Sequence, residues 1–270
     1  MSNIVLAGHL TDQHTQISTN TRNRLFPPPY QWLREAQAIA ADLKALNQHL
    51  EQCSPQEILR WAVDTFGDGV VMSSSFQHHG TALLHMVSQV CPDLLILFID
   101  TGFHFPETLA FKEQVTRLFS LRVVDVRPPL STQELGAVFG PDLPHRNPDL
   151  CCHLNKVLPM QQALRGRRAW ITGRRRDQSP TRAALPVVET CSDGLVKINP
   201  LAMWTGEDVL HYIAVHHLPP HPLYELGYRS IGCAPCTRPV RPGEHERAGR
   251  WPGHDKLECG LHTQGSASWG

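Results

Sequence analysis

The sequence has no apolar run that approaches the ~18 residues a helix needs to cross a bilayer. Its first residues, MSNIVLAGHLTDQHTQ, lack both the basic segment and the long apolar stretch of a secretory signal. We find no internal repeat. These absences predict a cytoplasmic protein without a membrane partner.

An excess of charge of either sign is also missing, because 25 Lys and Arg residues balance 25 Asp and Glu residues. Proteins that bind the nucleic-acid backbone usually carry a basic excess, so we expect no nucleic-acid partner. Hydrophobic residues make up 41% of the 270 residues, which is ordinary for a globular protein. The length suits one large α/β domain or two small ones.

Disulfides are rare in the cytoplasm, so the eight cysteines need another explanation. Cys151 and Cys152 are adjacent, and Cys233 and Cys236 form a C-x2-C pair. Adjacent side chains diverge and share one small tetrahedral ion only with backbone strain, whereas a [4Fe–4S] cube takes one thiolate per iron. The pattern favours an iron–sulfur cluster, with zinc or free thiols as alternatives.

Cys259 stands apart from these pairs in a polar segment near the C-terminus. The thiolate is the reactive form of cysteine, and nearby cations stabilise it. Arginines precede Cys259 at positions 238, 241, 247 and 250. Cys259 is therefore a candidate nucleophile, and an incidental exposed thiol is the alternative.

Apolar runs of strand length alternate with helical patterns. We predict helices over residues 31–50, 81–90, 106–119 and 206–217 and after Ser54-Pro55, and strands over 69–72, 94–99, 121–126 and 169–172. This alternation predicts an α/β fold with a doubly wound, mainly parallel sheet. We expect a flexible N-terminal arm (1–30), one α/β domain (31–239) and a mobile tail (240–270) that carries Cys259.

Polar residues follow three of the predicted strands, where ligands bind in such sheets. They are Ser73-Ser74-Ser75, Asp100-Thr101-Gly102 and Arg174-Arg175-Arg176. Arginine binds phosphate and sulfate through two parallel hydrogen bonds. The strand ends therefore predict an anion site, and a solvated basic face is the alternative. We expect His216, His217 and His221, beside a proline-rich turn, at the surface.

Together these motifs resemble the adenylyl-sulfate/phosphoadenylyl-sulfate reductase family. The likeness spans residues 60–262 and rests on the three strand ends, the cysteine pairs and the ending Glu258-Cys259-Gly260-Leu261-His262. It implies a nucleotide-binding fold resembling the adenine nucleotide alpha hydrolase-like (ATP pyrophosphatase) fold. The four paired cysteines mark the cluster-containing branch, which mostly acts on adenosine 5′-phosphosulfate (APS).

The resemblance also assigns roles to residues. It makes Cys259 the nucleophile, places Lys156 near a [4Fe–4S] cluster, and gives the cluster the ligands Cys151, Cys152, Cys233 and Cys236. It predicts that the following residues bind substrate: Ser73, Ser74, Ser75, Asp100, Thr101, Gly102, Arg175, Arg176, Arg247, Arg250 and His262.

The implied reaction is thiol-dependent reduction of APS to sulfite and AMP in assimilatory sulfate reduction. Cys259 would carry an S-sulfo intermediate that thioredoxin or glutaredoxin resolves. The loop from Ser73 to Gln77 is similar to that of reductases of 3′-phosphoadenosine 5′-phosphosulfate (PAPS), so PAPS or dual use stays an alternative.

Two proteins of other classes are alternatives to this function. A cluster-containing tRNA thiolation enzyme would need an intact Ser-Gly-Gly-x-Asp-Ser loop and a basic surface, and the sequence shows neither. A non-enzymatic zinc-binding module would leave Cys259 and the strand-end arginines unexplained. Whether the chain forms a homo-oligomer stays open.

Overall fold

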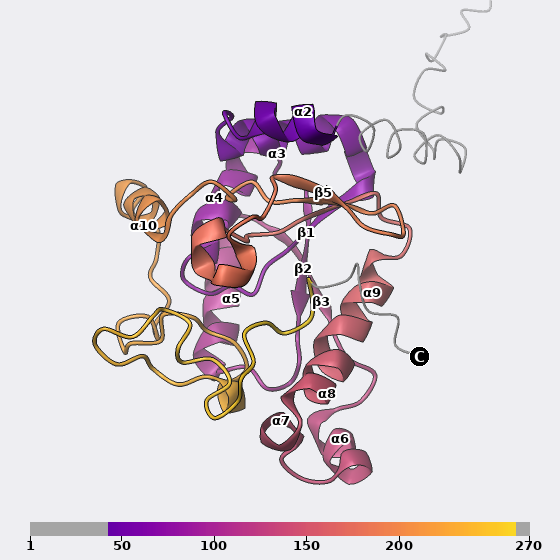
Figure 1. Cartoon of the computed structure of the whole chain (residues 1–270), viewed down its shortest axis with the longest axis vertical. Coiled ribbons are helices and arrows are strands. Elements are labelled where there is room, and N and C mark those ends of the chain that lie inside the picture. Colours follow the sequence, from indigo (N-terminus) through magenta and orange to yellow (C-terminus); the bar gives the residue numbers. More distant parts are fainter. Residues whose placement is uncertain (1–42, 263–270) are drawn as a thin grey trace, which may run out of the picture.

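The computed structural model describes residues 43–262. Its six-stranded sheet has the order β3-β2-β1-β4-β6-β5 (Figure 1). The strands are β1 (Val70–Ser73), β2 (Leu95–Ile99), β3 (Arg122–Val126), β4 (Ala169–Ile171), β5 (Val188–Thr190) and β6 (Val196–Ile198). Only β5, which pairs with β6, runs antiparallel to its neighbour within the described residues. The predicted doubly wound, mainly parallel sheet is confirmed.

The predicted helices inside the described residues are also present. They are α2 (Leu43–Leu50), α3 (Pro55–Phe66), α4 (Gly80–Val90), α5 (Pro106–Leu118) and α10 (Gly206–Val215). Helix α3 begins as its sequence predicts, because Ser54 and Glu57 cap each other's backbone N–H groups and Pro55 fills the first helical position. Residues 31–42 of the first predicted helix and the predicted arm (1–30) lie outside the described residues.

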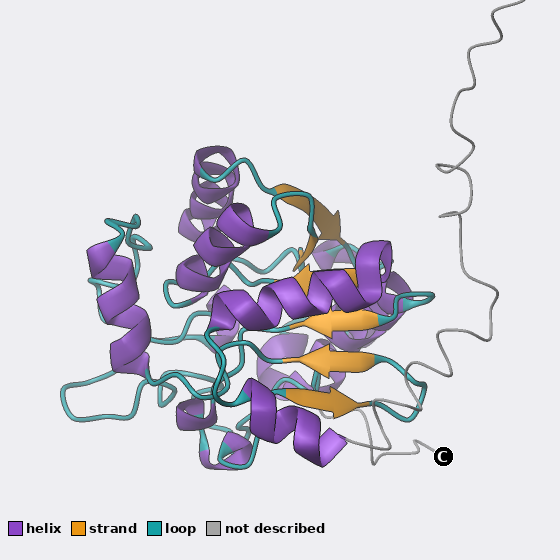
Figure 2. Cartoon of the chain, turned by 90° about the horizontal axis from the view of Figure 1, so that it is seen from above, coloured by secondary structure: helices purple, strands orange, loops and turns teal. Residues whose placement is uncertain are grey.

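Apolar side chains bury both faces of the central strands, and helices lie in front of and behind the strands (Figure 2). Met72 of β1 packs into the larger core with α3 and α4. Its neighbour Val71 points to the opposite face, beside Met160 of α9 (Leu158–Leu164). Burial on both faces explains why these strands read as continuous apolar runs. No helix within residues 43–262 is long and apolar enough to span a bilayer.

Two regions of secondary structure were not predicted. Between β3 and α9 the chain forms α6 (Thr132–Phe139), α7 (Leu143–Arg146), α8 (Pro148–Cys152) and a π-helical turn, η3 (His153–Val157). The hairpin of β5 and β6 was also missed. Short 3₁₀ turns occur at η2 (Gly67–Gly69), η4 (Arg176–Gln178), η5 (Pro180–Arg182) and η6 (Ala234–Cys236).

The C-terminal segment, yellow in Figure 1, folds back against the sheet domain. Thr237 and Arg250 form an antiparallel bridge, and the backbone N–H of Trp251 donates to the carbonyl of Cys236 at 3.0 Å. The Trp251 side chain is only 2% exposed. Residues 240–262 therefore have defined contacts, while the mobility predicted for the tail stays a prediction and residues 263–270 lie outside the described part.

One surface expectation was wrong. His221 is fully buried: its ring packs on Phe111, and its Nε2 lies 3.1 Å from the hydroxyl of Thr108. The expectation failed because the turn that carries His221 packs over α5. His216 and His217 are exposed, as expected.

Candidate active site

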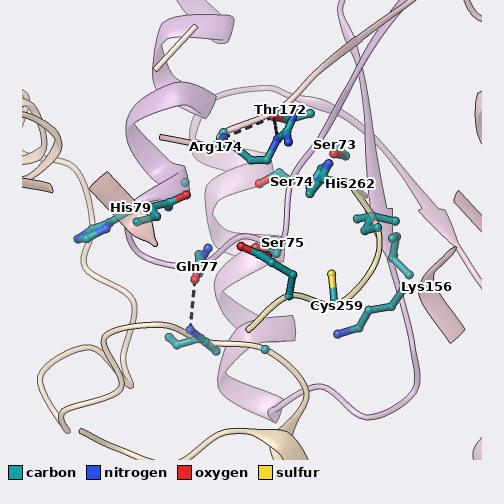
Figure 3. A pocket seen from close by; sticks show the side chains of 18 of the residues that line it. Ser73, Ser74, Ser75, Gln77, His79, Lys156, Thr172, Arg174, Cys259 and His262 are labelled. Atoms are coloured by element: carbon teal, nitrogen blue, oxygen red, sulfur yellow. Dashed lines mark hydrogen bonds between the residues drawn. The ribbon is translucent and has the colours of Figure 1, made fainter. Parts of the chain in front are cut away.

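A pocket of about 190 Å³ lies at the carboxyl ends of the strands (Figure 3). Strands β1 and β4 are direct neighbours, so the residues that follow them meet at one edge of the sheet. The C-terminal segment closes the pocket with Arg247, Arg250, Glu258, Cys259 and His262. The topology thus brings together groups that are almost 190 residues apart in sequence.

The loop after β1 supplies the three predicted serines to this pocket. The hydroxyl of Ser73 accepts a hydrogen bond from the Trp170 indole at 2.8 Å, and that of Ser74 accepts one from the backbone N–H of Phe76 at 3.1 Å. Phe76 is fully buried and has a left-handed φ of 51°, which is rare for a bulky residue. Core packing of Phe76 therefore fixes the loop in a shape that presents Ser74 and Ser75 to the pocket.

The arginine run after β4 contributes differently from the prediction. Arg174 lines the pocket and pairs with Glu189. Arg175 is buried and binds Asp177 at 2.9 Å, and Arg176 reaches Glu51 at 2.5 Å. The structure does not bring Arg175 and Arg176 into the pocket as the described residues form it. Their substrate contacts stay a prediction. A run of three arginines in a sequence does not by itself indicate which side chain faces the pocket.

The Asp100-Thr101-Gly102 motif lies toward the paired cysteines rather than in the pocket lining. The Thr101 hydroxyl is 3.3 Å from the sulfur of Cys233, and Asp100 accepts a hydrogen bond from Arg127 at 3.1 Å. Gly102 has a left-handed φ of 72°. This motif therefore connects the end of β2 to the cysteine region, and its direct contact with substrate stays a prediction.

The four paired cysteines converge although more than 80 residues separate the pairs. Cys151 and Cys152 end α8, Cys233 and Cys236 flank the turn η6, and all four side chains are buried. Each is a free thiol. Burial, together with the neighbouring thiols, raises the pKa of Cys151 to about 12 and that of Cys236 to about 11. Thiolates in this region therefore need a cationic partner.

The donor set fits a cluster better than a single ion. Within the described residues, no three His, Cys, Asp or Glu side chains come close enough together to hold one metal ion. The four thiols are buried and influence one another's pKa values, and a [4Fe–4S] cluster takes one thiolate per iron. Burial lowers the pKa of Lys156, but the Cys233, Cys152 and Cys259 sulfurs outweigh it and raise the pKa above its ordinary value. A charged ammonium therefore stands between the paired cysteines and the pocket.

The predicted nucleophile lies in the pocket with most of its predicted partners. Figure 3 shows Cys259 and Lys156 on the same side of the pocket. The Arg250 guanidinium stacks over Trp251 at 4.5 Å, and its Nε is buried with no partner among the described residues. The His262 ring stacks on Trp170 at 4.8 Å, and burial holds its pKa well below its ordinary value, so the imidazole is neutral. Arg250 thus retains a donor for an anion.

Two charged residues of the pocket, Arg182 and Glu258, were not among the predicted site residues. Arg182 lies three residues after Ser179, the end of the Arg-Arg-Asp-Gln-Ser motif, and Glu258 belongs to the Glu-Cys-Gly-Leu-His motif. Both motifs were recognised, but only the fold shows that these two side chains meet.

Comparison with known proteins settles the family. Residues 69–239 match the phosphoadenosine phosphosulfate reductase domain. The chain belongs to the phosphoadenosine phosphosulfate reductase family. The predicted resemblance is confirmed, and the motifs that carried it all lie in or beside the pocket and the paired cysteines.

Curated sulfonucleotide reductases match most of this chain. The adenosine 5′-phosphosulfate reductase of Streptomyces coelicolor is 46% identical, over 82% of this chain and 95% of its own. That of Mycolicibacterium smegmatis is 41% identical over 92% and 99%. The phosphoadenosine 5′-phosphosulfate reductase of Gloeobacter violaceus is 45% identical over 86% and 99%. The relatives thus carry both substrate names.

Solved structures support the fold of the reductase. The phosphoadenylyl-sulfate reductase of Candida auris superimposes with a TM-score of 0.63 at 38% identity, over 72% of this chain and 95% of that one. Candida glabrata FMN adenylyltransferase matches at a TM-score of 0.51 and 16% identity, over 79% and 78%, which shows the fold alone. The predicted adenine nucleotide alpha hydrolase-like fold is confirmed.

Proposed function

We propose that this reductase converts adenosine 5′-phosphosulfate to sulfite and AMP with electrons from a dithiol protein, as a cytoplasmic enzyme of assimilatory sulfate reduction. The observation that carries the proposal is the position of Cys259. Its thiol shares one strand-end pocket with Arg247, Arg250 and Lys156, and the family is one of sulfonucleotide reductases. A nucleophile among fixed cations suits displacement at an anionic sulfuryl group.

The first step is attack on sulfur. The Cys259 thiolate forms a bond to the sulfur of the substrate, and the bond between that sulfur and the bridging oxygen breaks. AMP leaves with the electron pair, and Cys259 carries an S-sulfo group. Negative charge grows on the leaving phosphate, and Arg247, Arg250 and the Lys156 ammonium are preorganised to stabilise it.

The second step transfers the electrons. A thiolate of the reductant attacks the Cys259 sulfur, and sulfite departs with the electron pair of the broken sulfur–sulfur bond. The second thiol of the reductant then releases Cys259 and leaves a disulfide on the reductant. Sulfur is thereby reduced by two electrons and the dithiol is oxidised by two. Thioredoxin or glutaredoxin supplies such a dithiol.

The cysteines Cys151, Cys152, Cys233 and Cys236 would hold a [4Fe–4S] cluster, for which four buried thiols from two segments are suited. When bound, the cluster supplies fixed charge beside the pocket and ties α8 to the turn η6. The two steps above balance without any electron from it. Lys156 provides the contact between this region and the reacting sulfur.

Charge pairing supports APS over PAPS as the preferred substrate. The pocket arginines Arg174 and Arg182 are already paired with Glu189 and Glu258. The 3′-phosphate of PAPS would have to displace one of these carboxylates, which costs about 1.5–3 kcal/mol for each charged hydrogen bond lost. The serine loop and the Gloeobacter relative favour PAPS, which remains the second candidate. Arg22 and Arg24, two basic residues of the predicted N-terminal arm, lie outside the described residues.

The deciding experiment is an anaerobic assay of sulfite release with APS and PAPS side by side at equal ionic strength. We expect a higher kcat/KM for APS. A preference for PAPS of about tenfold or more, equivalent to about 1.4 kcal/mol, would reverse the substrate assignment. Near-equal values would indicate a dual-substrate reductase, and no sulfite from either would reject the proposed function.

A further inference from the structure

The side chain directly before the nucleophile is held by several donors from the η4–η5 region. The Arg182 guanidinium binds the Glu258 carboxylate through two parallel hydrogen bonds, with Nε 2.8 Å from Oε1 and Nη2 2.6 Å from Oε2. The hydroxyls of Ser179 and Thr181 donate to the same Oε1, each at 3.2 Å. Both charged side chains are shielded, with 12% and 19% exposure. A bidentate, shielded pair of this kind is stronger than an exposed ion pair.

The pair also explains what Arg182 does in the pocket. The edge of its guanidinium that carries Nε and Nη2 is occupied by Glu258, and its Nη1 donates to Gln178. Burial alone would raise the pKa of Glu258, but the Arg182 hydrogen bonds reverse this and lower it, so the carboxylate stays charged. Arg182 is therefore committed to Glu258 rather than to a substrate anion.

The two reaction steps make opposite demands on Cys259. Attack needs its sulfur inside the pocket, where Lys156 lies beside it. Resolution needs the same sulfur to meet a thiol carried on the backbone of another protein, and the serine loop, the end of β4 and the C-terminal segment wall the pocket around Cys259. Residues around Cys259 must therefore leave the wall of the pocket between the steps.

The contacts of the segment show where such a movement is controlled. On one side of Cys259 the carbonyl of Leu257 accepts a hydrogen bond from Arg247 at 2.6 Å. On the other side, Lys197 donates to the carbonyl of His262 at 3.2 Å. The ion pairs nearest to Cys259 in sequence are both made by Glu258, with Arg182 at 2.6 Å and with Arg247 at 3.5 Å, and the Arg182 contact is the shorter and the bidentate one. It fixes the residue adjacent to the nucleophile through a charged interaction that can open without disturbing the apolar core.

We propose that the Glu258–Arg182 pair is a latch that sets the position of Cys259. Closed, it holds the thiol in the pocket for attack on the sulfonucleotide. Open, it lets the S-sulfo cysteine reach the dithiol reductant. The inference rests on the proposed two-step reaction, and both latch residues are positioning residues that act through Cys259.

A single-turnover experiment separates the two steps. The full-length, cluster-loaded enzyme is mixed anaerobically with APS alone, and the S-sulfo adduct on Cys259 is followed by mass spectrometry. Reduced thioredoxin is then added to preformed adduct, and sulfite release is timed. For Glu258→Gln we expect adduct formation to slow about tenfold, as loss of a charged hydrogen bond predicts, while sulfite release is unchanged or faster. Arg182→Lys, which keeps the charge but not the fork, should slow adduct formation less.

The chain offers a matched control. Glu244 pairs with Arg238 in the same segment, through contacts of 2.8 and 3.1 Å, but does not line the pocket. Glu244→Gln should change neither step. Equal slowing of both steps in Glu258→Gln would show a general structural role and overturn the latch, as would no change in either step.

A second readout does not depend on the reaction. Alkylation of Cys259 by iodoacetamide, without nucleotide and followed by peptide mapping, should be about tenfold faster in Glu258→Gln than in the parent enzyme and unchanged in Glu244→Gln. An unchanged alkylation rate would overturn the latch even if sulfite is produced. Faster alkylation in an enzyme that forms no S-sulfo adduct would reject the proposed function and keep the positional part of the latch.

Discussion

The sheet and the C-terminal segment are stabilised by different interactions. Side chains such as Val71 and Phe98 in the central strands are inaccessible to water and packed on apolar neighbours. The segment after residue 240 is held largely by charged contacts, among them Glu258 with Arg182 and Lys256 with Asp149. Apolar burial responds little to salt, whereas partly exposed ion pairs weaken as salt rises. The enzyme thus combines a rigid platform, the sheet domain, with a nucleophile whose position depends on ion pairs that can open.

The largest effect is expected at the nucleophile itself. Cys259→Ser should lower turnover by on the order of 10³-fold or more, because serine replaces a thiolate with a far weaker nucleophile. Fold and iron content should not change, since Cys259 lies outside the paired cysteines. Mass spectrometry after addition of APS should find the S-sulfo group on Cys259 of the parent enzyme and none on the variant. An adduct on another cysteine would contradict the assignment.

Removal of a predicted cluster ligand tests how the platform is connected to the C-terminal segment. Cys233→Ser should lose the bound iron and its brown colour. The free energy of unfolding should also fall, because the cluster ties α8 to η6 and loss of metal frees both. Iron analysis and denaturant unfolding measure the two effects. Cys53→Ser, at a half-buried cysteine in the α2–α3 turn, is the control and should keep full iron; full iron in Cys233→Ser would contradict the ligand set.

Acid should weaken the platform through its buried histidines. Burial lowers the pKa of His79 to about 3 and the pKa values of His78 and His221 to about 4. These histidines are neutral in the folded protein and bind protons in the unfolded chain. Their contribution to stability is therefore complete above the unfolded pKa of 6.5 and is lost as the pH falls from there toward 4. At pH 5 each of these histidines lowers the free energy of unfolding by up to ~2 kcal/mol. Denaturant unfolding at pH 7 and pH 5 should show this loss of unfolding free energy, and the loss should be smaller in His221→Gln. An equal loss in both proteins would contradict the prediction.

The smallest effect concerns the fit of Arg250 against Gly232. A Cβ on Gly232 would overlap the Arg250 guanidinium, so Gly232→Ala should displace this cation. We expect KM for APS to rise about tenfold, which corresponds to about 1.4 kcal/mol of lost binding, with little change in stability. Gly136→Ala is the control, because nothing lies within 4 Å of its new methyl group. An unchanged KM in Gly232→Ala would remove Arg250 from the substrate site.

The platform was predictable from sequence and the details of the pocket were not. Strands such as Leu95–Ile99 are buried on both faces and therefore read as apolar runs. The hairpin of Val188–Thr190 and Val196–Ile198 was missed because three-residue strands carry almost no periodic signal. The helices between Thr132 and Leu164 were missed because each has at most eight residues, too few for a clear helical period, and prolines stand at the starts of α7, α8 and α9.

At the site, residue types were predicted better than orientations. Cys259, Arg247, Arg250, His262 and Lys156 all line the pocket, as their motifs indicated. Of the arginine run, Arg174 lines the pocket, while Arg175 and Arg176 pair with Asp177 and Glu51 and their substrate contacts stay a prediction. The partner of Glu258 lies 76 residues earlier in the sequence, and no local pattern announces a contact over that separation.

The π-helical turn His153–Val157 imposes a constraint on the length of this segment. It directly follows Cys152 and directly precedes α9, whose Met160 packs under the sheet. A π-helical turn already accommodates one residue more than an α-helical turn, so inserting a further residue here would rotate the paired cysteines by about 100° relative to the packed face of α9. Insertions in this turn should therefore not be tolerated, and neither should replacement of Lys156, which the turn carries into the pocket. Alignments of functional homologues should show no insertion between Cys151 and Met160.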